Sequence, residues 1–358
     1  MQRAIVNRLV AVDVNPATRH IVTGTERYTR ELCARLAGAA PDLAFRFYAS
    51  RPKSDLGVDV TVLPFRRLWS QVRLPAALAG ARPDLLFVPG HSIPFAWAGR
   101  SLAVIHDLAF ERHPEAYSAA QRIHLQLTTR WAVTRCRVLI AVSESTRRDI
   151  ASLYGVNPSR IRVIPHGGGE ASSVRPASAS QLGALGLTGD FVLQVGRVEA
   201  RKNQLAALAA VERVPDLTLA VAGPEVDSAL AVKLRASKSC RVLGRVDQPT
   251  LELLYKRAKA VVVPSLYEGF GLPVLEAMAR GQVVVAARTS SLPEVGGDAV
   301  LYVDDPDDAG AFASVLERAL ADGEARASLT RLATQRAREF TWERCAQQTA
   351  EVLREALG

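Results

Sequence analysis

Two glutamates with seven residues between them, Glu268 and Glu276, flank a Gly-Phe-Gly-Leu-Pro turn in the segment PSLYEGFGLPVLEAMARG at 264–281. The apolar run AVVVPS at 260–265 predicts a buried strand. Glu268 then lies beyond the carboxyl end of that strand, where open α/β sheets bind ligands. Pro273 suits the first turn of a helix, which places Glu276 near a helix N-terminus. Each glutamate alone could serve only a loop or a helix dipole, but together with the turn they predict one ligand site.

A second cluster lies in QVGRVEARKNQ at 194–204. Gly196 ends a predicted strand, and Arg197 and Lys202 follow around a predicted helix start. A strand, a glycine turn and a helix N-terminus form an anion site, because N–H groups and the helix dipole face the ligand. Two cations in this place would neutralise a diphosphate. A helix start with ordinary surface charges is the plainer alternative.

Short apolar runs alternate with amphipathic stretches, and these elements must position the two clusters. Predicted strands cover 9–14, 44–50, 85–89, 102–107, 138–143, 161–165, 191–196, 217–223, 241–246, 260–265 and 283–287. Predicted helices cover 24–38, 119–136, 143–155, 202–213, 226–238, 249–258 and 273–280, with further helical stretches from about 306 to the end. A break rich in Gly and Ser at 166–190 divides the alternation. We therefore predict an α/β fold with two units in series, each with its own parallel sheet, and a ligand site between the units.

The composition is that of a globular chain. Of its 358 residues, 48% are hydrophobic and 23% are charged, and the length suits two domains. No apolar run approaches the ~18 residues of a membrane span, and the N-terminal segment lacks the apolar core of a signal peptide. The four cysteines are scattered without a CxxC pair, which argues against structural zinc.

Positive charge is concentrated in the first half of the chain. Residues 1–170 contain 23 Arg and Lys against 13 Asp and Glu, whereas the remainder contains 22 against 23. Such an excess could face nucleic acid, an anionic membrane or a phosphate-bearing substrate. Aromatic residues make up only 6%, and no stacking motif is visible, so we expect no nucleic-acid partner. An Arg-rich surface without a partner is the plainer alternative.

Taken together, the motifs resemble those of the family 4 retaining glycosyltransferases of the GT-B fold. EGFGLPVLEAMARG is similar to the Glu-x7-Glu signature of that family, and VGRVEARKN to its phosphate-binding loop. GTERYTREL, VIHDL, VSESTRRDI and VIPHG resemble its N-terminal half in the expected order, so the resemblance covers essentially the whole chain. The N-terminal pattern, including LWSQVRLP, is most like bacterial mannosyltransferases of O-antigen and exopolysaccharide assembly.

The resemblance implies two Rossmann-like domains with parallel sheets facing across a deep cleft. The first, 1–168, would bind the acceptor, and the second, 169–340, would bind the nucleotide-sugar donor. The last helix, 341–358, would pack back toward the first domain.

The resemblance also implies a role for each matching residue. Arg197 and Lys202 would hold the donor diphosphate. Glu268 would contact hydroxyls of the donor sugar, and Glu276 the ribose. His106 would face the transferred sugar or the acceptor, although a histidine that only serves its strand end is the alternative. The expected catalytic residues are Glu268, His106, Arg197 and Lys202. The expected nucleotide-sugar-binding residues are Gly24, Gly196, Arg197, Lys202, Val246, Glu268, Phe270, Gly271, Leu272 and Glu276.

The implied reaction is retaining transfer of a hexose from a nucleotide-sugar to a glycan, with mannose from GDP-mannose as the expected donor. A UDP- or dTDP-sugar donor, and a non-catalytic scaffold that binds nucleotide-sugars, are the alternatives. A nicotinamide dehydrogenase is disfavoured because the G-x-G-x-x-G fingerprint is absent. The sequence leaves open whether transfer is a double displacement or a front-face attack.

We expect neither a metal site nor another cofactor. The Asp-x-Asp pattern in DDPDD at 304–308 fits a turn before a helix, with Asp305 as its cap and Pro306 in its first turn. Arg197, Lys202 and nearby N–H groups could stabilise the leaving diphosphate without a divalent ion.

The basic first half would suit a lipid-pyrophosphate-linked glycan acceptor at the inner membrane face. FRRLWSQVRL at 65–74, with Trp69, Val72 and paired arginines, is the segment that could contact that surface. Packing of Trp69 inside the domain is the alternative. We therefore expect a cytoplasmic protein, and the sequence leaves open whether it contacts the cytoplasmic membrane face peripherally.

Overall fold

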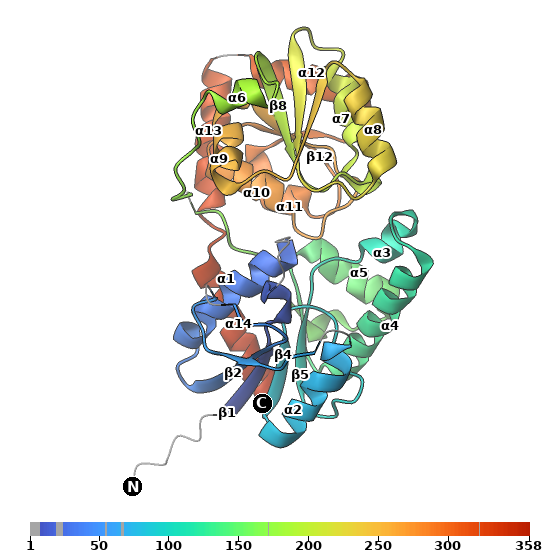
Figure 1. The fold of residues 1–358 in the computed structure, drawn as a ribbon, viewed down its shortest axis with the longest axis vertical. Helices are drawn as coiled ribbons and strands as arrows, with labels where there is room; N and C mark the ends of the chain where they lie inside the picture. The colour runs from blue at the N-terminus through green and yellow to red at the C-terminus, as the bar shows by residue number, and fades with distance from the viewer. Residues whose placement is uncertain (1–7, 19–23, 54–55, 66–67, 171, 322) are drawn as a thin grey trace. The chain divides into compact units, whose positions relative to one another are not determined.

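The structure is a computed structural model that describes residues 8–18, 24–53, 56–65, 68–170, 172–321 and 323–358. The chain divides into two compact units (Figure 1). The first comprises Met1–Gly167 with Thr341–Gly358, and the second comprises Gly168–Phe340. The first unit therefore takes its last helix from the far end of the chain.

The described residues of the first unit form a parallel seven-stranded sheet in the order β3-β2-β1-β4-β5-β6-β7. Its strands are β1 (Arg8–Asp13), β2 (Leu43–Ala49), β3 (Val60–Val62), β4 (Leu85–Val88), β5 (Ser101–Ile105), β6 (Leu139–Ala141) and β7 (Ile161–Val163). The strand order reverses between β1 and β4, where Val10 pairs with Leu85. In sheets of this kind, ligands bind at the carboxyl ends of the strands that flank such a reversal.

Helices cover both faces of this sheet. The α-helices of the first unit are α1 (Gly24–Ala39), α2 (Leu74–Ala81), α3 (Ala109–Arg112), α4 (Ala119–Arg135), α5 (Glu144–Tyr154) and α14 (Trp342–Leu357). The first and last of these, α1 and α14, pack against each other. On the opposite face, Leu78 of α2, Val133 of α4 and Ile150 of α5 share a core with Leu86 and Ile105 of the sheet.

The second unit is built on a parallel sheet whose six described strands have the order β10-β9-β8-β11-β12-β13. They are β8 (Asp190–Val195), β9 (Leu217–Ala222), β10 (Cys240–Gly244), β11 (Ala260–Val263), β12 (Val284–Ala287) and β13 (Leu301–Val303). Here the strand order reverses between β8 and β11, where Val192 pairs with Ala260.

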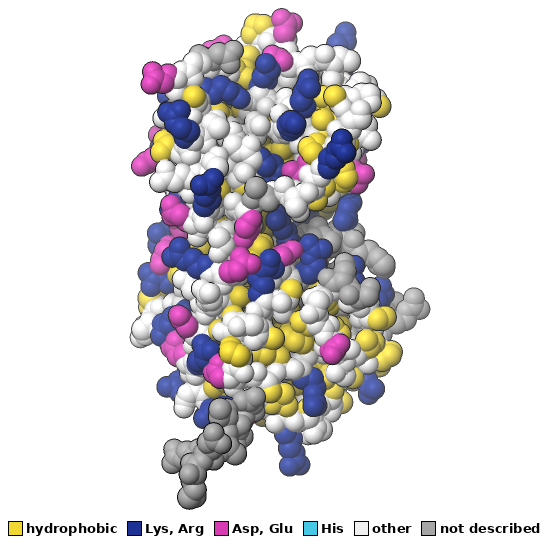
Figure 2. All heavy atoms as spheres, turned by 90° about the vertical axis from the view of Figure 1, so that its left-hand side faces the viewer, with side chains coloured by type: hydrophobic (Ala, Val, Ile, Leu, Met, Phe, Trp, Pro, Cys, Tyr) yellow, Lys and Arg dark blue, Asp and Glu magenta, His cyan; other side chains and the backbone are white. Residues whose placement is uncertain are grey.

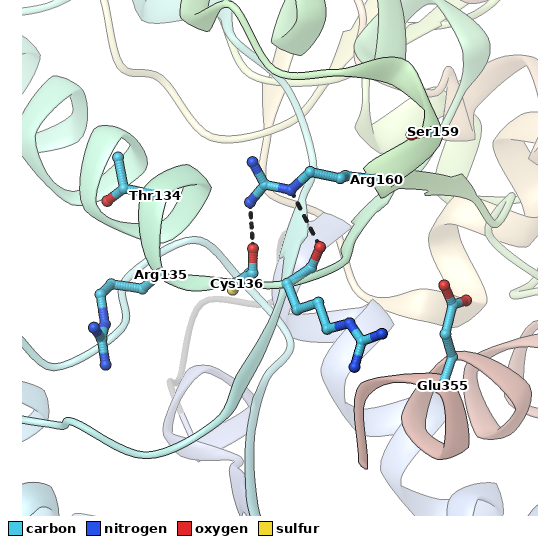
Figure 3. Close-up of a pocket in the computed structure, with 7 residues that line it drawn as sticks. Thr134, Arg135, Cys136, Ser159, Arg160 and Glu355 are labelled. Carbon is cyan, nitrogen blue, oxygen red and sulfur yellow. Dashed lines mark hydrogen bonds between the residues drawn. The ribbon is translucent and has the colours of Figure 1, made fainter. Parts of the chain in front are cut away.

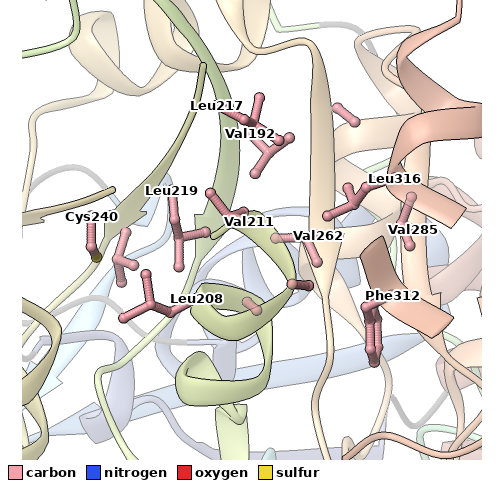
Figure 4. Packing of buried hydrophobic residues seen from close by; sticks show 14 of the residues in the cluster. Val192, Leu208, Val211, Leu217, Leu219, Cys240, Val262, Val285, Phe312 and Leu316 are labelled. Atoms are coloured by element: carbon pink, nitrogen blue, oxygen red, sulfur yellow. The ribbon is translucent and has the colours of Figure 1, made fainter. Parts of the chain in front are cut away.

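The helices of the second unit also lie on both faces of their sheet (Figure 1). They are α6 (Gln181–Ala184), α7 (Gln204–Val211), α8 (Ser228–Ala236), α9 (Gln248–Arg257), α10 (Leu272–Ala279), α11 (Leu292–Gly296), α12 (Ala309–Leu320) and α13 (Glu324–Ala337). In the core, Val211 of α7 and Phe312 of α12 pack with Leu219 and Val262 of the sheet (Figure 4). Burial of each such side chain stabilises the fold by roughly 1.5–3 kcal/mol.

The two parallel sheets confirm the predicted α/β class with two Rossmann-like domains. The predicted start of the last helices is wrong in detail. α12 begins at Ala309, and its cap is Asp308, whose Oδ1 accepts a hydrogen bond from Ala311 N at 2.9 Å. Asp305 instead accepts one from Asp307 N at 3.0 Å, so it serves the turn and not the helix.

Of the two interpretations of Trp69, packing inside the domain is confirmed. Its side chain is 5% exposed and belongs to the core of the first unit, and its Nε1 donates a hydrogen bond to Leu63 O at 2.9 Å. The paired arginines of that segment, Arg66 and Arg67, lie outside the described residues. In the described ranges, every helix is too short or too polar to cross a membrane.

Candidate functional site

The carboxyl ends of β8 and β11 lie side by side where the strand order of the second unit reverses. The loop after β8 begins at Gly196, whose N–H donates to Ala222 O at 2.9 Å. Gly223 follows β9 with φ of 157°, and a Cβ there would lie 1.9 Å from Gly196 O. Only glycine fits so close to the neighbouring backbone. This contact fixes the path of the loop that carries Arg197 and Lys202.

Lys202 and Glu268, predicted from separate motifs, meet at this edge. Lys202 Nζ lies 2.5 Å from Glu268 Oε1, and both residues are at least nine-tenths buried. Ser265 Oγ donates to the same carboxylate oxygen at 2.8 Å, and Gln194 Nε2 donates to Lys202 O at 2.7 Å. The two side chains therefore form one buried ion pair held from both strands.

Arg201 also belongs to this cluster, although we did not predict it from the sequence. Its Nη1 donates to Tyr267 O at 2.6 Å and lies 3.5 Å from Glu268 Oε2, while Nη2 donates to Glu199 Oε1 at 2.8 Å. The side chain is about nine-tenths buried. The signal was present in the sequence as two adjacent cations in EARKN. Of these two we assigned only the lysine, because the family resemblance implied a role for Arg197 and Lys202 alone.

That helix in fact begins later than predicted. Ala200–Lys202 form a short 3-10 turn, Asn203 takes a left-handed conformation with φ of 51°, and α7 begins at Gln204. The turn directs both Arg201 and Lys202 inward. Arg197 instead is half-exposed, with Nε 3.4 Å from Glu199 Oε2.

Burial and charge act against each other on the ion pair. Burial alone would raise the pKa of Glu268, but the charges of Lys202 and Arg201 outweigh it and hold that pKa below its usual range. Burial lowers the pKa of Lys202, and the like charge of Arg201 acts in the same direction against the attraction of Glu268. The cluster of Arg197, Arg201 and Lys202 with Glu199 and Glu268 has more cations than carboxylates, so an anionic group would complete it.

The turn after Glu268 is held by its own contacts. Glu268 N donates to Ser290 Oγ at 2.8 Å, and Ser291 Oγ donates to Glu268 O at 2.9 Å. Gly271 precedes α10 with φ of 104°, a conformation that favours glycine. Phe270 is buried against Phe340, with ring centroids 5.8 Å apart. Leu272 then begins α10, so the N-terminal end of this helix lies beside the ion pair in sequence and in space.

Glu276 lies one turn into α10 and has a different environment from Glu268. Tyr255 OH donates to its Oε2 at 3.0 Å. Arg280 supports this contact, because its guanidinium lies 4.6 Å from the Tyr255 ring centre and donates to Glu276 O at 2.8 Å. Glu252 in turn pairs with Arg280 at 2.5 Å. Glu276 is thus held by Tyr255 and Arg280 and is not part of the Lys202–Glu268 pair.

The first unit places a histidine cluster at the carboxyl edge of its sheet. His106 follows β5, and its Nε2 donates to Pro89 O at 3.0 Å. Its ring centroid lies 4.8 Å from Tyr28 and 5.4 Å from His166. Burial lowers the pKa of His106, so the ring is neutral near pH 7. With the proton on Nε2, Nδ1 is a buried acceptor without a partner among the described residues.

His91, in the loop after β4, belongs to the same cluster. Its Nδ1 is also buried without a hydrogen-bond partner in the part of the chain that the structure describes. Burial, with the neighbouring His106 acting the same way, lowers its pKa to about 4. We did not predict His91, because no motif marked it.

The remaining predicted residues are more distant from these contacts. Gly24 is the first residue of α1 in the first unit, and Val246 is half-buried in the loop between β10 and α9. Their predicted roles toward a donor stay predictions. Within the described ranges, no three His, Cys, Asp or Glu side chains are placed to hold a metal ion.

A surface pocket of the first unit has a structural explanation (Figure 3). Arg160 points into it from the turn before β7, and its guanidinium donates to Cys136 O at 2.5 Å. The same group also donates to Val133 O at 3.0 Å. These carbonyls belong to the C-terminal end of α4, and the last carbonyl groups of a helix have no intrahelical hydrogen-bond donors. Arg160 therefore caps a helix.

Elsewhere, Figure 2 shows Lys and Arg side chains interspersed with Asp and Glu over the visible face.

The chain matches two family models that divide it between them. Residues 22–167 match the model described as Glycosyltransferase Family 4, and residues 183–336 match Glycosyl transferases group 1. An O-antigen chain mannosyltransferase B from Escherichia coli is 31% identical over 269 residues, which cover 70% of this chain and 69% of that protein. The chain belongs to the family 4 glycosyltransferases.

This glycosyltransferase also resembles relatives with other names. A glycogen synthase from Mycobacterium tuberculosis is 30% identical over 286 residues, covering 76% of this chain and 66% of that protein. A solved structure of HepE from Anabaena, in complex with UDP and glucose, has a TM-score of 0.75 at 18% identity. It covers 98% of this chain and 100% of its own. The relatives therefore agree on the GT-B fold and on glycosyl transfer, whereas they differ in the sugar.

Proposed function

We propose that this glycosyltransferase transfers mannose, with retention of configuration, from GDP-mannose to a glycan or lipid-linked glycan in bacterial polysaccharide assembly. The buried cluster of Arg201, Lys202 and Glu268 at the reversal of the second sheet carries the proposal of a nucleotide-sugar donor. The E. coli O-antigen mannosyltransferase supports the choice of mannose.

The charges of the cluster support the binding of a diphosphate. Lys202 and Arg201 are cations held by fixed contacts, and Arg197 is half-exposed beside them. In the reaction, negative charge grows on the diphosphate oxygen that leaves the sugar. Cations fixed in advance stabilise such a charge without reorganisation, because they already point toward it. We propose that the donor phosphate also pairs with Lys202, so that Lys202 is shared between the phosphate and Glu268. Glu268 then accepts hydrogen bonds from hydroxyls of the donor sugar.

The remaining roles follow the same division. We propose that Glu276, oriented by Tyr255, accepts a hydrogen bond from the ribose. The N–H groups of Phe270, Gly271 and Leu272 would meet the sugar and phosphate. Val246 would lie near the base, with Gly196 beside the phosphates and Gly24 approaching them. His106, whose Nδ1 is a buried hydrogen-bond acceptor, would accept a hydrogen bond from a hydroxyl of the transferred sugar or of the acceptor glycan. No metal or other cofactor enters this scheme.

The alternatives differ in the base of the donor or in whether the sugar is transferred at all. A UDP-sugar donor is favoured by the likeness to HepE, whose structure holds UDP; a dTDP-sugar stays open as well. A non-catalytic scaffold would bind the donor without transfer, but it would not need the Lys202–Glu268 pair to be retained. Double displacement and front-face attack are both compatible with a single carboxylate at this position.

Thermal unfolding with GDP, UDP, dTDP and ADP, each alone and as its sugar conjugates, would identify the donor. A ligand at 100 times its Kd should add about 2.7 kcal/mol of stability. We expect the largest shift with GDP-mannose, and a larger shift with UDP-glucose would replace it as donor. Transfer should persist in EDTA, and a strict requirement for Mn²⁺ would overturn the metal-free scheme.

A further inference from the structure

The loop after β12 directs three successive hydroxyl groups to the segment that carries Glu268. Thr289 Oγ1 donates to Ser265 O at 2.7 Å. Ser290 Oγ accepts a hydrogen bond from Glu268 N at 2.8 Å, and Ser291 Oγ donates to Glu268 O at 2.9 Å. We call Thr289, Ser290 and Ser291 the hydroxyl clamp. Both backbone polar groups of Glu268 are therefore held by side chains that follow the neighbouring strand.

The other side of the same segment is held by the loop after β8. Leu266 N donates to Arg201 O at 2.9 Å, and Arg201 Nη1 donates to Tyr267 O at 2.6 Å. The segment Ser265–Glu268 thus lies between loops that follow the two strands flanking β11. Fixing the backbone on both sides restricts the Glu268 side chain to few positions, and a group fixed in advance binds its ligand with little reorganisation.

The hydroxyl of Ser291 is not used by its own helix. Ser291 is the residue before α11, where a serine side chain commonly accepts a hydrogen bond from an N–H group of the first turn. Within the described residues, Ser291 makes no such bond. The residue is fully buried, and its hydroxyl donates to Glu268 O instead. Capping of α11 therefore does not explain the direction of this side chain.

Ser290 has a backbone conformation that lowers stability. Its φ is 45°, in the left-handed region that residues other than glycine rarely adopt. Glycine would fit this conformation without strain, but it has no hydroxyl group to accept the Glu268 N–H. Backbone strain of this kind persists where the surrounding contacts impose it, and it is concentrated at functional sites. Serine is thus worse than glycine for the backbone at this position and better for holding Glu268.

We propose that the hydroxyl clamp positions Glu268 for the donor sugar, so that its three members are positioning residues for glycosyl transfer. The inference rests on the proposed contact between Glu268 and the sugar hydroxyls. The clamp holds the backbone of Glu268, while Lys202 Nζ and Ser265 Oγ contact its carboxylate. Loss of a clamp hydroxyl should therefore weaken binding of the sugar and leave binding of the diphosphate unchanged, because Lys202 and Arg201 keep their places.

Calorimetric titration with a nucleotide-sugar and with its free nucleotide separates these two contributions. GDP-mannose with GDP is the first pair of probes, and UDP-glucose with UDP is the second. Within the pair that the unchanged protein binds more tightly, the ratio of the two affinities reports the contribution of the sugar. Ser290→Gly and Ser290→Ala should each lower this ratio about threefold to tenfold and leave the affinity for the free nucleotide unchanged.

The two substitutions differ in the strain that they leave at position 290. Ser290→Gly removes the strain and Ser290→Ala keeps it, so the alanine variant should unfold at a lower temperature than the glycine variant. An equal loss of the affinity ratio at unequal stability is the result expected of positioning. A ratio that follows stability from one variant to the other would overturn the inference. Thr289→Ser, which keeps a hydroxyl, should preserve the ratio, whereas Thr289→Val should lower it.

Asp216→Gly is the matched control, because Asp216 has a left-handed φ of 57° in the turn before β9. This variant should gain stability and keep both affinities. Glu268→Ala tests the proposed sugar contact itself. An unchanged ratio in Glu268→Ala would remove the proposed role of Glu268 and the inference with it. A lowered ratio in Glu268→Ala, with unchanged ratios in Ser290→Gly and Thr289→Val, would overturn the clamp alone.

Discussion

The two units carry opposite chemistry at corresponding edges of their sheets. The second unit places Lys202, Arg201 and Glu268 beyond β8 and β11, where charged atoms contact one another directly. The first unit places His91 and His106 beyond β4 and β5, where burial keeps the rings neutral. The same fold therefore gathers fixed charges at one edge and neutral rings at the other.

The largest expected effect is that of Glu268→Ala. Transfer should be abolished, and the variant should also lose about 3–5 kcal/mol of unfolding free energy, because Lys202 would remain buried without its partner. The notion that Glu268 only touches substrate predicts an unchanged fold. Urea unfolding beside an initial-rate assay distinguishes the two. Full stability with full loss of transfer would show that Lys202 finds another partner.

Lys202→Met should reduce kcat by about 10²–10³, because the variant would lose one cation at the proposed position of the leaving diphosphate. Stability should fall less than in Glu268→Ala, since Arg201 still lies beside the carboxylate. The exposed Lys233 on α8 is a matched control, and Lys233→Met should transfer at the normal rate. A kcat within about twofold of normal in Lys202→Met would remove the lysine from the mechanism.

Burial of His91 should make the stability of the fold depend on pH between 6.5 and about 4, whereas the Lys202–Glu268 pair should have no effect in that window. In the unfolded chain His91 takes up a proton below its ordinary pKa of 6.5, whereas in the fold it does so only near 4. The unfolded state thus binds more protons in this window, so stability falls as the pH drops through it. Glu268, whose pKa is lowered, loses its contribution only below its ordinary 4.5.

Urea midpoints measured across that window would check this order. His91→Asn should flatten the decline, and His113→Asn, which changes a histidine paired with Glu115 at 3.2 Å, is the control. A decline of the same steepness in His91→Asn would assign the effect to other groups.

The smallest expected effect is that of Tyr255→Phe, which removes one hydrogen bond to Glu276. The KM for the donor should rise about threefold to tenfold with little change in kcat, because the proposed ribose contact would be made equally before and during transfer. Tyr154→Phe is matched, since it removes a 2.8 Å contact to Glu111 in the first unit. A drop in kcat instead of a rise in KM would connect Glu276 to the chemical step.

The sequence predicted the elements better than the contacts between their ends. The alternation of apolar runs gave both sheets, because parallel strands buried on two faces are uniformly apolar. It missed β3 and β13, which have only three residues each. The sequence predicted that Lys202 and Glu268 bind the same ligand, but it did not predict that they contact each other. That contact depends on the side-chain directions set by the 3-10 turn at Ala200–Lys202. No local pattern signals that turn.

The capping error and the two open interpretations of Trp69 have a similar origin. Several aspartates in DDPDD could begin the helix, and the fold selects Asp308. Trp69 lies in a basic, amphipathic stretch, yet its indole fills the core under α2. Which face of such a stretch turns inward is decided by packing against segments distant in the chain, which single-sequence periodicity does not contain.

The return of α14 to the first unit has a consequence for the order of synthesis. α14 packs on α1 and contacts β4 and β5, yet it is translated after all of Gly168–Phe340. During translation, one face of the first sheet therefore stays partly uncovered until α14 has been made. By then, all of the second unit has already been translated. The N-terminal half is begun first and finished last, so chaperone binding to nascent chains should concentrate on the interval before residue 342 appears.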